Sequence, residues 1–161
     1  MKIITLYSLL MLLSFTMCAQ SLSRSLGNMK TMKKSAQGIT IQTDFGNLKA
    51  TVYSPNVLKI NITRNSVFTD FSYAVNVLPT EAVNFTVTED KSKITLATDS
   101  LTLTISKQPV RVALYNKAGQ LINGDDADFG TSWIDDEITT YKKLLPNEKF
   151  IGLGEKTGGL N

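Results

Sequence analysis

Six carboxylates lie close together near the C-terminal end of this 161-residue chain. They fall within residues 125–137 with no basic residue between them, and they are Asp125, Asp126, Asp128, Asp135, Asp136 and Glu137. Such a cluster has three interpretations: a calcium loop, a pair of carboxylates that hydrolyses a glycosidic bond, or an exposed acidic loop followed by an edge strand at 138–141. The chain's only Trp, Trp133, lies inside the cluster together with Phe129.

The calcium interpretation is disfavoured by the spacing. Asp126, Asp128 and Glu137 align with positions 1, 3 and 12 of a calcium loop, but Gly130 and Thr131 occupy the positions that need a ligand and the sharp-turn Gly. We therefore predict no metal site and no cofactor. For the catalytic pair, the sequence cannot supply the required separation of about 5 to 5.5 Å. The acidic loop is the favoured interpretation.

An aromatic face beside hydrogen-bonding acids suits a sugar ring, whose C–H face stacks and whose hydroxyls form hydrogen bonds. Asp128, Phe129 and Trp133 are therefore candidate sugar-contacting residues. Trp133 is equally compatible with a core position at the end of a β-sandwich.

The composition limits the chemistry further. The chain has no His, one Cys, 42% hydrophobic residues and a formal net charge of +3. The absence of His excludes an imidazole base, a Ser/His/Asp triad and His-containing zinc sites. Three surplus positive charges spread along the chain do not form the basic footprint of a nucleic-acid-binding protein. The length suits one globular domain.

The N-terminus has the pattern of a signal peptide over residues 1–20: Lys2 precedes an apolar stretch from Ile3 to Phe15, and small residues follow. The stretch is too short for a membrane span, which needs about 20 apolar residues. We expect export to the periplasm or the extracellular space. Lipoprotein anchoring through Cys18 is less favoured than simple cleavage, because Met17 precedes it where a small residue is usual. Residues 21–37 are basic and lack periodicity, which predicts a flexible leader.

Apolar and polar residues alternate from Ile39 onward, and turn residues separate the alternating segments. This pattern predicts an all-β fold, an antiparallel β-sandwich over residues 38–161, in which two sheets cover each other's apolar faces. The inward-facing residues lie in segments centred on Ile41, Ala50, Ile60, Val75, Phe85, Ile94, Leu103 and Val112.

The last twelve residues, Phe150 to Asn161, read Phe-Ile-Gly-Leu-Gly-Glu-Lys-Thr-Gly-Gly-Leu-Asn. They resemble the Gly-Leu-Gly-Glu segment of glycoside hydrolase family 31, the α-glucosidases and α-xylosidases. In that family the segment ends an N-terminal β-sandwich of galactose-mutarotase-like type, just before the catalytic (β/α)8 barrel. The resemblance extends from about residue 38 to the end.

The resemblance implies a retaining α-glycosidase acting on α-linked glucose or xylose, whose two catalytic Asp residues belong to a barrel. A barrel needs about 250 residues, so we expect this chain to be the non-catalytic N-terminal domain, inactive alone and packed on that barrel. The run Trp133 to Glu137 is superficially similar to the family's nucleophile motif, but it lies upstream of the Gly-Leu-Gly-Glu segment and is one residue short.

In the complete enzyme, Asp128, Phe129, Trp133 and Glu155 are the residues expected to help wall the sugar pocket. Glu155 is also suited to satisfying backbone donors in its Gly-rich turn. The alternative is a stand-alone carbohydrate-binding or adhesin-like module, which predicts oligosaccharide affinity that depends on Trp133.

Overall fold

The computed structural model of the chain describes residues 24–68 and 83–149, and the regular elements in these two ranges are all β-strands. The predicted all-β fold is thereby confirmed. No helix in the described ranges is long and apolar enough to cross a bilayer. The expected signal peptide, the candidate strand around Val75 and the segment that contains Glu155 lie outside the described residues.

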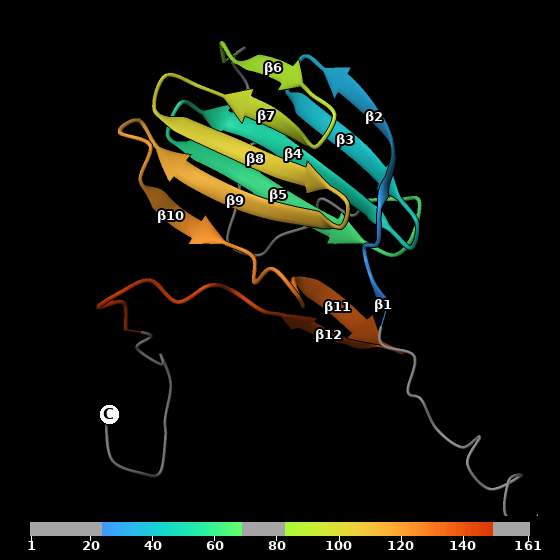
Figure 1. The fold of residues 1–161 in the computed structure, drawn as a ribbon. Helices are drawn as coiled ribbons and strands as arrows, with labels where there is room; N and C mark the ends of the chain where they lie inside the picture. The colour runs from blue at the N-terminus through green and yellow to red at the C-terminus, as the bar shows by residue number, and fades with distance from the viewer. Residues whose placement is uncertain (1–23, 69–82, 150–161) are drawn as a thin grey trace, which may run out of the picture.

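The first large sheet has four strands in the order β2-β3-β4-β5, and each strand pairs antiparallel with the next (Figure 1). It is a simple meander, as expected where short turns join alternating segments. Its strands are β2 (Met29–Ser35), β3 (Gly38–Thr43), β4 (Asn47–Ser54) and β5 (Val57–Thr63). Ile60 on the edge strand β5 keeps 37% of its surface exposed, because β5 has no neighbour on its outer side among the described strands.

The second large sheet has five strands in the order β10-β9-β8-β7-β6, again all antiparallel. Its strands are β6 (Thr86–Glu89), β7 (Lys93–Ala97), β8 (Leu101–Lys107), β9 (Val110–Asn116) and β10 (Leu121–Gly124). The turn between β6 and β7 is fixed by Asp90, whose Oδ1 accepts hydrogen bonds from the backbone N–H groups of Ser92 and Lys93 at 2.7 and 2.9 Å. These bonds, the one from Ser92 first, lower the pKa of Asp90 below its usual value.

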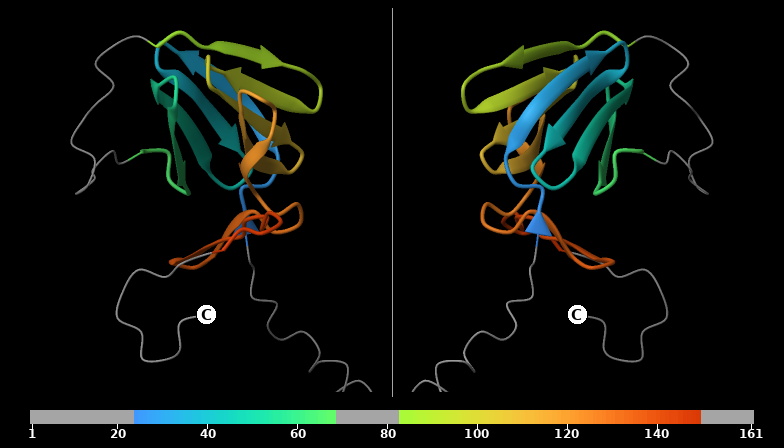
Figure 2. Two further views of the ribbon diagram at one scale, coloured as in Figure 1. Left: turned by 90° about the vertical axis from the view of Figure 1, so that its left-hand side faces the viewer. Right: turned by 90° about the vertical axis from the view of Figure 1, so that its right-hand side faces the viewer.

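The two sheets face each other as layers, and the core lies between them (Figure 2). Each sheet contributes the apolar face that its alternation predicts. The fully buried side chains include Ile39, Ile41, Leu48, Ile94, Leu96, Leu103 and Ile105.

A third, small sheet lies at one end of the sandwich and joins the first described strand to the last two (Figures 1 and 2). Its order is β1-β11-β12, with β1 (Arg24–Ser25), β11 (Thr131–Ile134) and β12 (Glu137–Thr140). Arg24 pairs with Trp133, and Trp133 pairs in turn with Ile138. Trp133 is 6% exposed and belongs to the core cluster, so this sheet packs on the sandwich through its central strand.

The predicted flexible leader is wrong for its described part, because residues 24–35 contribute two strands to the fold. Leu26 between them is 2% exposed and belongs to the core cluster. The signal is hidden because the register of β2 against β3 shifts between Met29 and Thr31. The partly buried residues Met29 and Met32 are therefore three positions apart instead of two. In addition, β2 is an edge strand whose other side chains are polar and exposed.

Truncating Leu26 tests this assignment. We expect Leu26→Ala to lower the free energy of unfolding of the full chain by about 2 to 5 kcal/mol, since it opens a cavity in the core. Urea denaturation followed by circular dichroism measures the change. Val57→Ala is the control: Val57 is 52% exposed, and its truncation should change the free energy by no more than about 0.5 kcal/mol. If both variants change the free energy of unfolding by the same small amount, the assignment is wrong and Leu26 belongs to a solvated leader.

Candidate functional site

The acidic segment of residues 125–137 divides into a loop, the strand β11 and a hairpin turn. The loop comprises residues 125–130 and crosses from β10 of the large sheet to β11 of the small one. Asp135 and Asp136 form the two-residue turn between β11 and β12. The edge strand expected at 138–141 is present as β12 (Glu137–Thr140).

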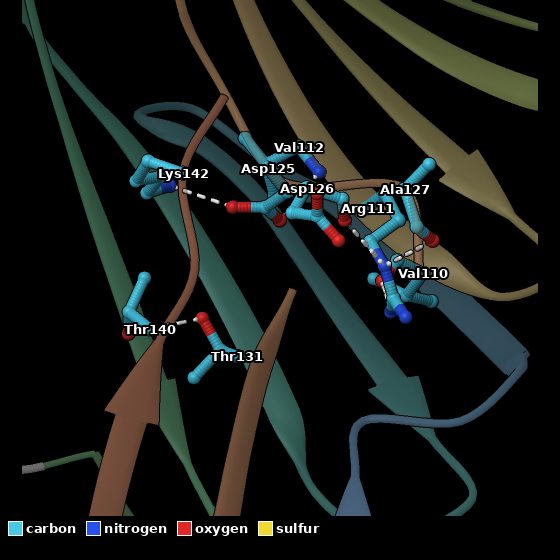
Figure 3. Close-up of polar contacts among 9 residues, drawn as sticks. All are labelled: Val110, Arg111, Val112, Asp125, Asp126, Ala127, Thr131, Thr140 and Lys142. Carbon is cyan, nitrogen blue, oxygen red and sulfur yellow. Dashed lines mark hydrogen bonds and ion pairs between the residues drawn. The ribbon is translucent and has the colours of Figure 1, made fainter. Parts of the chain in front are cut away.

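Asp125 fastens this segment to the sandwich, and its side chain is 4% exposed. Its Oδ1 forms an ion pair with Lys142 Nζ at 2.6 Å, and its Oδ2 accepts the backbone N–H of Val112 at 2.8 Å (Figure 3). Each carboxylate oxygen therefore has a partner, as a buried charge requires. The strand β9, which carries Val112, and the segment after β12, which carries Lys142, are joined through one carboxylate.

Arg111 holds the other side of the loop through main-chain carbonyls. Its Nε donates to the carbonyls of Asp126 and Ala127 at 3.1 and 3.0 Å, and its NH2 group donates to that of Asp128 at 2.7 Å. Its NH1 group donates to the carbonyl of Val110, in the same strand, at 2.8 Å (Figure 3). The guanidinium thus gathers three consecutive carbonyls of the loop, which a planar group with five donors can do.

Asp126 and Gly130 serve the local path of the loop. Asp126 Oδ1 accepts the N–H groups of Asp128 and Phe129, both at 3.0 Å, in an Asx turn. Gly130 has φ +57°, and a Cβ at this position would lie 2.8 Å from Arg111 Nε. Gly130 is therefore required by the turn and by the guanidinium. No group of three or more His, Cys, Asp or Glu residues in the described ranges is placed to hold a metal ion.

The hairpin turn is linked to the end of β5 by Arg64. Its NH1 group donates to the carbonyl of Asp135, and its NH2 group pairs with Asp136 Oδ1 at 2.8 Å. Asp135 adopts φ +49°, which Asp tolerates in tight turns. Trp133 to Glu137 thus form the end of a hairpin. Arg64 pairs with the carboxylate of Asp136 and with the backbone of Asp135.

The three described candidate residues for sugar contact do not share one surface. Asp128 and Phe129 lie in the exposed loop, whereas Trp133 is 6% exposed in the core cluster. Phe129 is 58% exposed, and its ring centroid lies 5.0 Å from that of Tyr141. The loop therefore presents an aromatic pair to the outside, whereas the indole serves mainly to pack the small sheet against the sandwich.

Two hollows flank Trp133. The first, of about 500 Å³, opens between the edge strands β5 and β12, with Ile60 and Ile138 among its walls. The second, of about 860 Å³, is bordered by β1, β2, the turn between β3 and β4, the residues after β5, and the end of β11. Sequence reasoning missed the second hollow, since its walls come from five separate segments.

A family model, the glycosyl hydrolase 31 N-terminal galactose mutarotase-like domain, matches residues 47–161. The chain belongs to this family. The resemblance seen in the sequence is thereby confirmed, and the matched range includes β4 to β12.

Relatives of this glycosyl hydrolase 31 domain are carbohydrate-active enzymes. Alpha-glucosidase 2 of Bacillus thermoamyloliquefaciens is 27% identical over 137 residues, which cover 84% of this chain and 17% of the relative. A family 31 dextranase of Flavobacterium johnsoniae, solved in complex with isomaltotriose, superposes with a TM-score of 0.75 and is 27% identical over 85% of this chain and 17% of its own.

A cycloalternan-forming enzyme of Listeria monocytogenes shares the fold, with a TM-score of 0.57 and 17% identity over 69% of this chain and 10% of its own. The chain thus spans about one sixth of the α-glucosidase and of the dextranase, since the aligned share is 17% of each.

The Asp125 contacts generate a stability prediction. Asp125→Ala removes the partner of Lys142 and leaves the Val112 N–H without its acceptor, so we expect a loss of about 2 to 4 kcal/mol in the free energy of unfolding. Chemical denaturation of the full chain measures it. Asp128→Ala is the matched control from the same loop. Asp128 is exposed and contributes its backbone to these contacts, so its truncation should cost no more than about 0.5 kcal/mol. A loss at Asp128 as large as that at Asp125 would contradict the assignment.

Proposed function

We propose that this chain is the non-catalytic N-terminal domain of an exported α-glycosidase that acts on α-linked glucose or xylose. The observation that carries the proposal is the family match over residues 47–161. In addition, the chain covers only 17% of the length of the α-glucosidase and 17% of that of the dextranase. In this assignment the catalytic carboxylates belong to a barrel that follows the domain. The signal-peptide pattern of residues 1–20 supports export.

The contacts of the acidic segment support a structural role for these carboxylates. Asp125 is buried with Lys142, Asp126 fixes a turn, and Asp136 pairs with Arg64. A retaining glycosidase needs one carboxylate free to attack and a second one able to donate a proton. Three of the six carboxylates are instead engaged by cations or backbone donors of the domain itself.

The exposed apolar residues support packing on a catalytic domain. Four large hydrophobic side chains between residues 129 and 144 are at least 45% exposed: Phe129, Ile138, Tyr141 and Leu144. We call this group the 129–144 apolar surface. Clustered apolar side chains mark contact surfaces. In the relatives this domain is N-terminal, so the polypeptide that follows it continues from the segment after β12 and is the natural occupant.

The first test is an activity assay. We expect the purified chain to show no turnover of 4-nitrophenyl α-glucoside or α-xyloside, because the reaction needs both carboxylates of the barrel. Release of nitrophenolate, followed by absorbance, measures this. Measurable turnover that Asp135→Asn abolishes would contradict the proposal and place the nucleophile in the β11–β12 turn.

The second test concerns the 129–144 apolar surface. Sedimentation velocity of the full chain should show self-association, since this surface is uncovered without its occupant. The double variant Ile138→Ser/Leu144→Ser should shift the chain toward the monomer without lowering the free energy of unfolding. Ile122→Ser is the control, because Ile122 is 42% exposed but lies on β10, outside this surface. If the control has the same effect as the double variant, the surface has no special role in docking.

A further inference from the structure

We propose that the hollow of about 860 Å³ beside Trp133 is a carbohydrate site, which binds a neutral α-linked gluco-oligosaccharide. We call it the Phe45 basin, after the aromatic residue at its border. Its volume lies within the range of about 300 to 1,000 Å³ that is typical of ligand sites. The choice of an α-linked glucan rests on the proposed function, whereas the site itself rests on the geometry described below.

The floor of the basin is preformed. Thr43, which is 3% exposed, donates its hydroxyl to the Gly46 carbonyl at 2.8 Å and accepts the Gly46 N–H at 3.1 Å. A Cβ on Gly46 would lie 2.7 Å from the carbonyl oxygen of Thr63 and 3.2 Å from Trp133 Cη2. The turn between β3 and β4 is therefore packed tightly on the indole. A rigid floor reduces the ordering cost of binding.

One border of the basin is aromatic and partly exposed. Phe45 is 51% exposed, and the guanidinium of Arg24 lies 5.7 Å from its ring centroid. The backbone N–H of Phe45 donates to the carbonyl of Leu26 at 3.2 Å, which fixes the position of the residue. Ile134, 42% exposed, adds an apolar group at the end of β11. The guanidinium lies over the ring, so a pyranose can pack its C–H face only on the part of the ring that Arg24 leaves exposed, while the guanidinium donates to hydroxyls.

The other walls carry both donors and acceptors, which suits a polyhydroxyl ligand. Asn47 donates its side-chain N–H to the main-chain carbonyl of Asn65 at 2.9 Å, so the start of β4 is joined to the segment after β5 at this wall. Gln42, whose Oε1 accepts from Thr31 at 3.3 Å, belongs to the same lining. Amide groups of this kind pair with sugar hydroxyls in either direction.

The charges of the basin favour a neutral ligand over an anion. Lys30 Nζ lies 3.6 Å from Asp44 Oδ1, and the NH2 group of Arg64 lies 2.8 Å from Asp136 Oδ1. Two of the cations on the lining thus have a carboxylate beside them, which offsets the attraction for a negatively charged ligand. A neutral saccharide can bind to such paired groups without separating the charges.

Isomaltotriose is the probe for the experiment, and Trp133 is the reporter. Trp133 is the chain's only Trp and lines both the basin and the hollow between β5 and β12, so its fluorescence reports binding at either one, and the Phe45 variants assign the signal to the basin. Titration of the full chain should give a saturable change, with a matching affinity from calorimetry. Phe45→Ala should weaken the affinity by roughly tenfold, which corresponds to the loss of one stacking contact. Phe45→Leu, which keeps apolar bulk but lacks the ring, should weaken it to a similar extent and guards against a folding defect.

Phe129→Ala is the matched control. Phe129 is 58% exposed, close to the 51% of Phe45, but it does not line the basin. Its truncation should leave the affinity unchanged. If Phe129→Ala loses affinity and the Phe45 variants do not, the proposal is wrong and the saccharide binds at the loop of residues 125–130. Absence of binding, or displacement of isomaltotriose by millimolar phosphate, would also overturn it. These readouts are binding constants, so they stand apart from the activity assay that tests the proposed function.

Discussion

The position of the small sheet depends on the packing of Trp133 in the core. Its strand is the centre of the small sheet, with β1 on one side and β12 on the other. The indole is part of the core cluster, and its Cη2 would lie 3.2 Å from a Cβ on Gly46. A small three-stranded sheet has little core of its own, so its stability comes from the apolar area that it buries against the sandwich. The loop and the two hollows take their positions from that packing.

Where strict alternation runs through a strand, the sequence was sufficient to predict the fold. The run from Ile94 to Val112 forms β7, β8 and β9 with the expected inward residues, because a period of two defines one apolar face. The first two strands could not be predicted in the same way. The register shift in β2 removes the period, and Leu26 is a single buried residue between polar neighbours.

The candidate site was less accessible to sequence reasoning. The acidic cluster and its aromatic residues attract attention through residue type, yet the contacts that organise them come from Arg111, Arg64 and Lys142. Arg111 binds main-chain carbonyls 15 to 17 residues further along the chain, and a carbonyl has the same chemistry in every residue type. Such contacts leave no pattern in the sequence. The Phe45 basin has the same property, since its walls come from segments far apart in the chain.

The pairing of β1 with β11 also has a consequence for the order in which the chain folds. Arg24 lies opposite Trp133, so more than a hundred residues separate the two partners of this ladder. The two meanders, by contrast, form from neighbouring strands that meet soon after they are made. Loop closure over long separations is slow compared with hairpin formation. We therefore expect the ladder between β1 and β11 to form after the hairpins of the two large sheets.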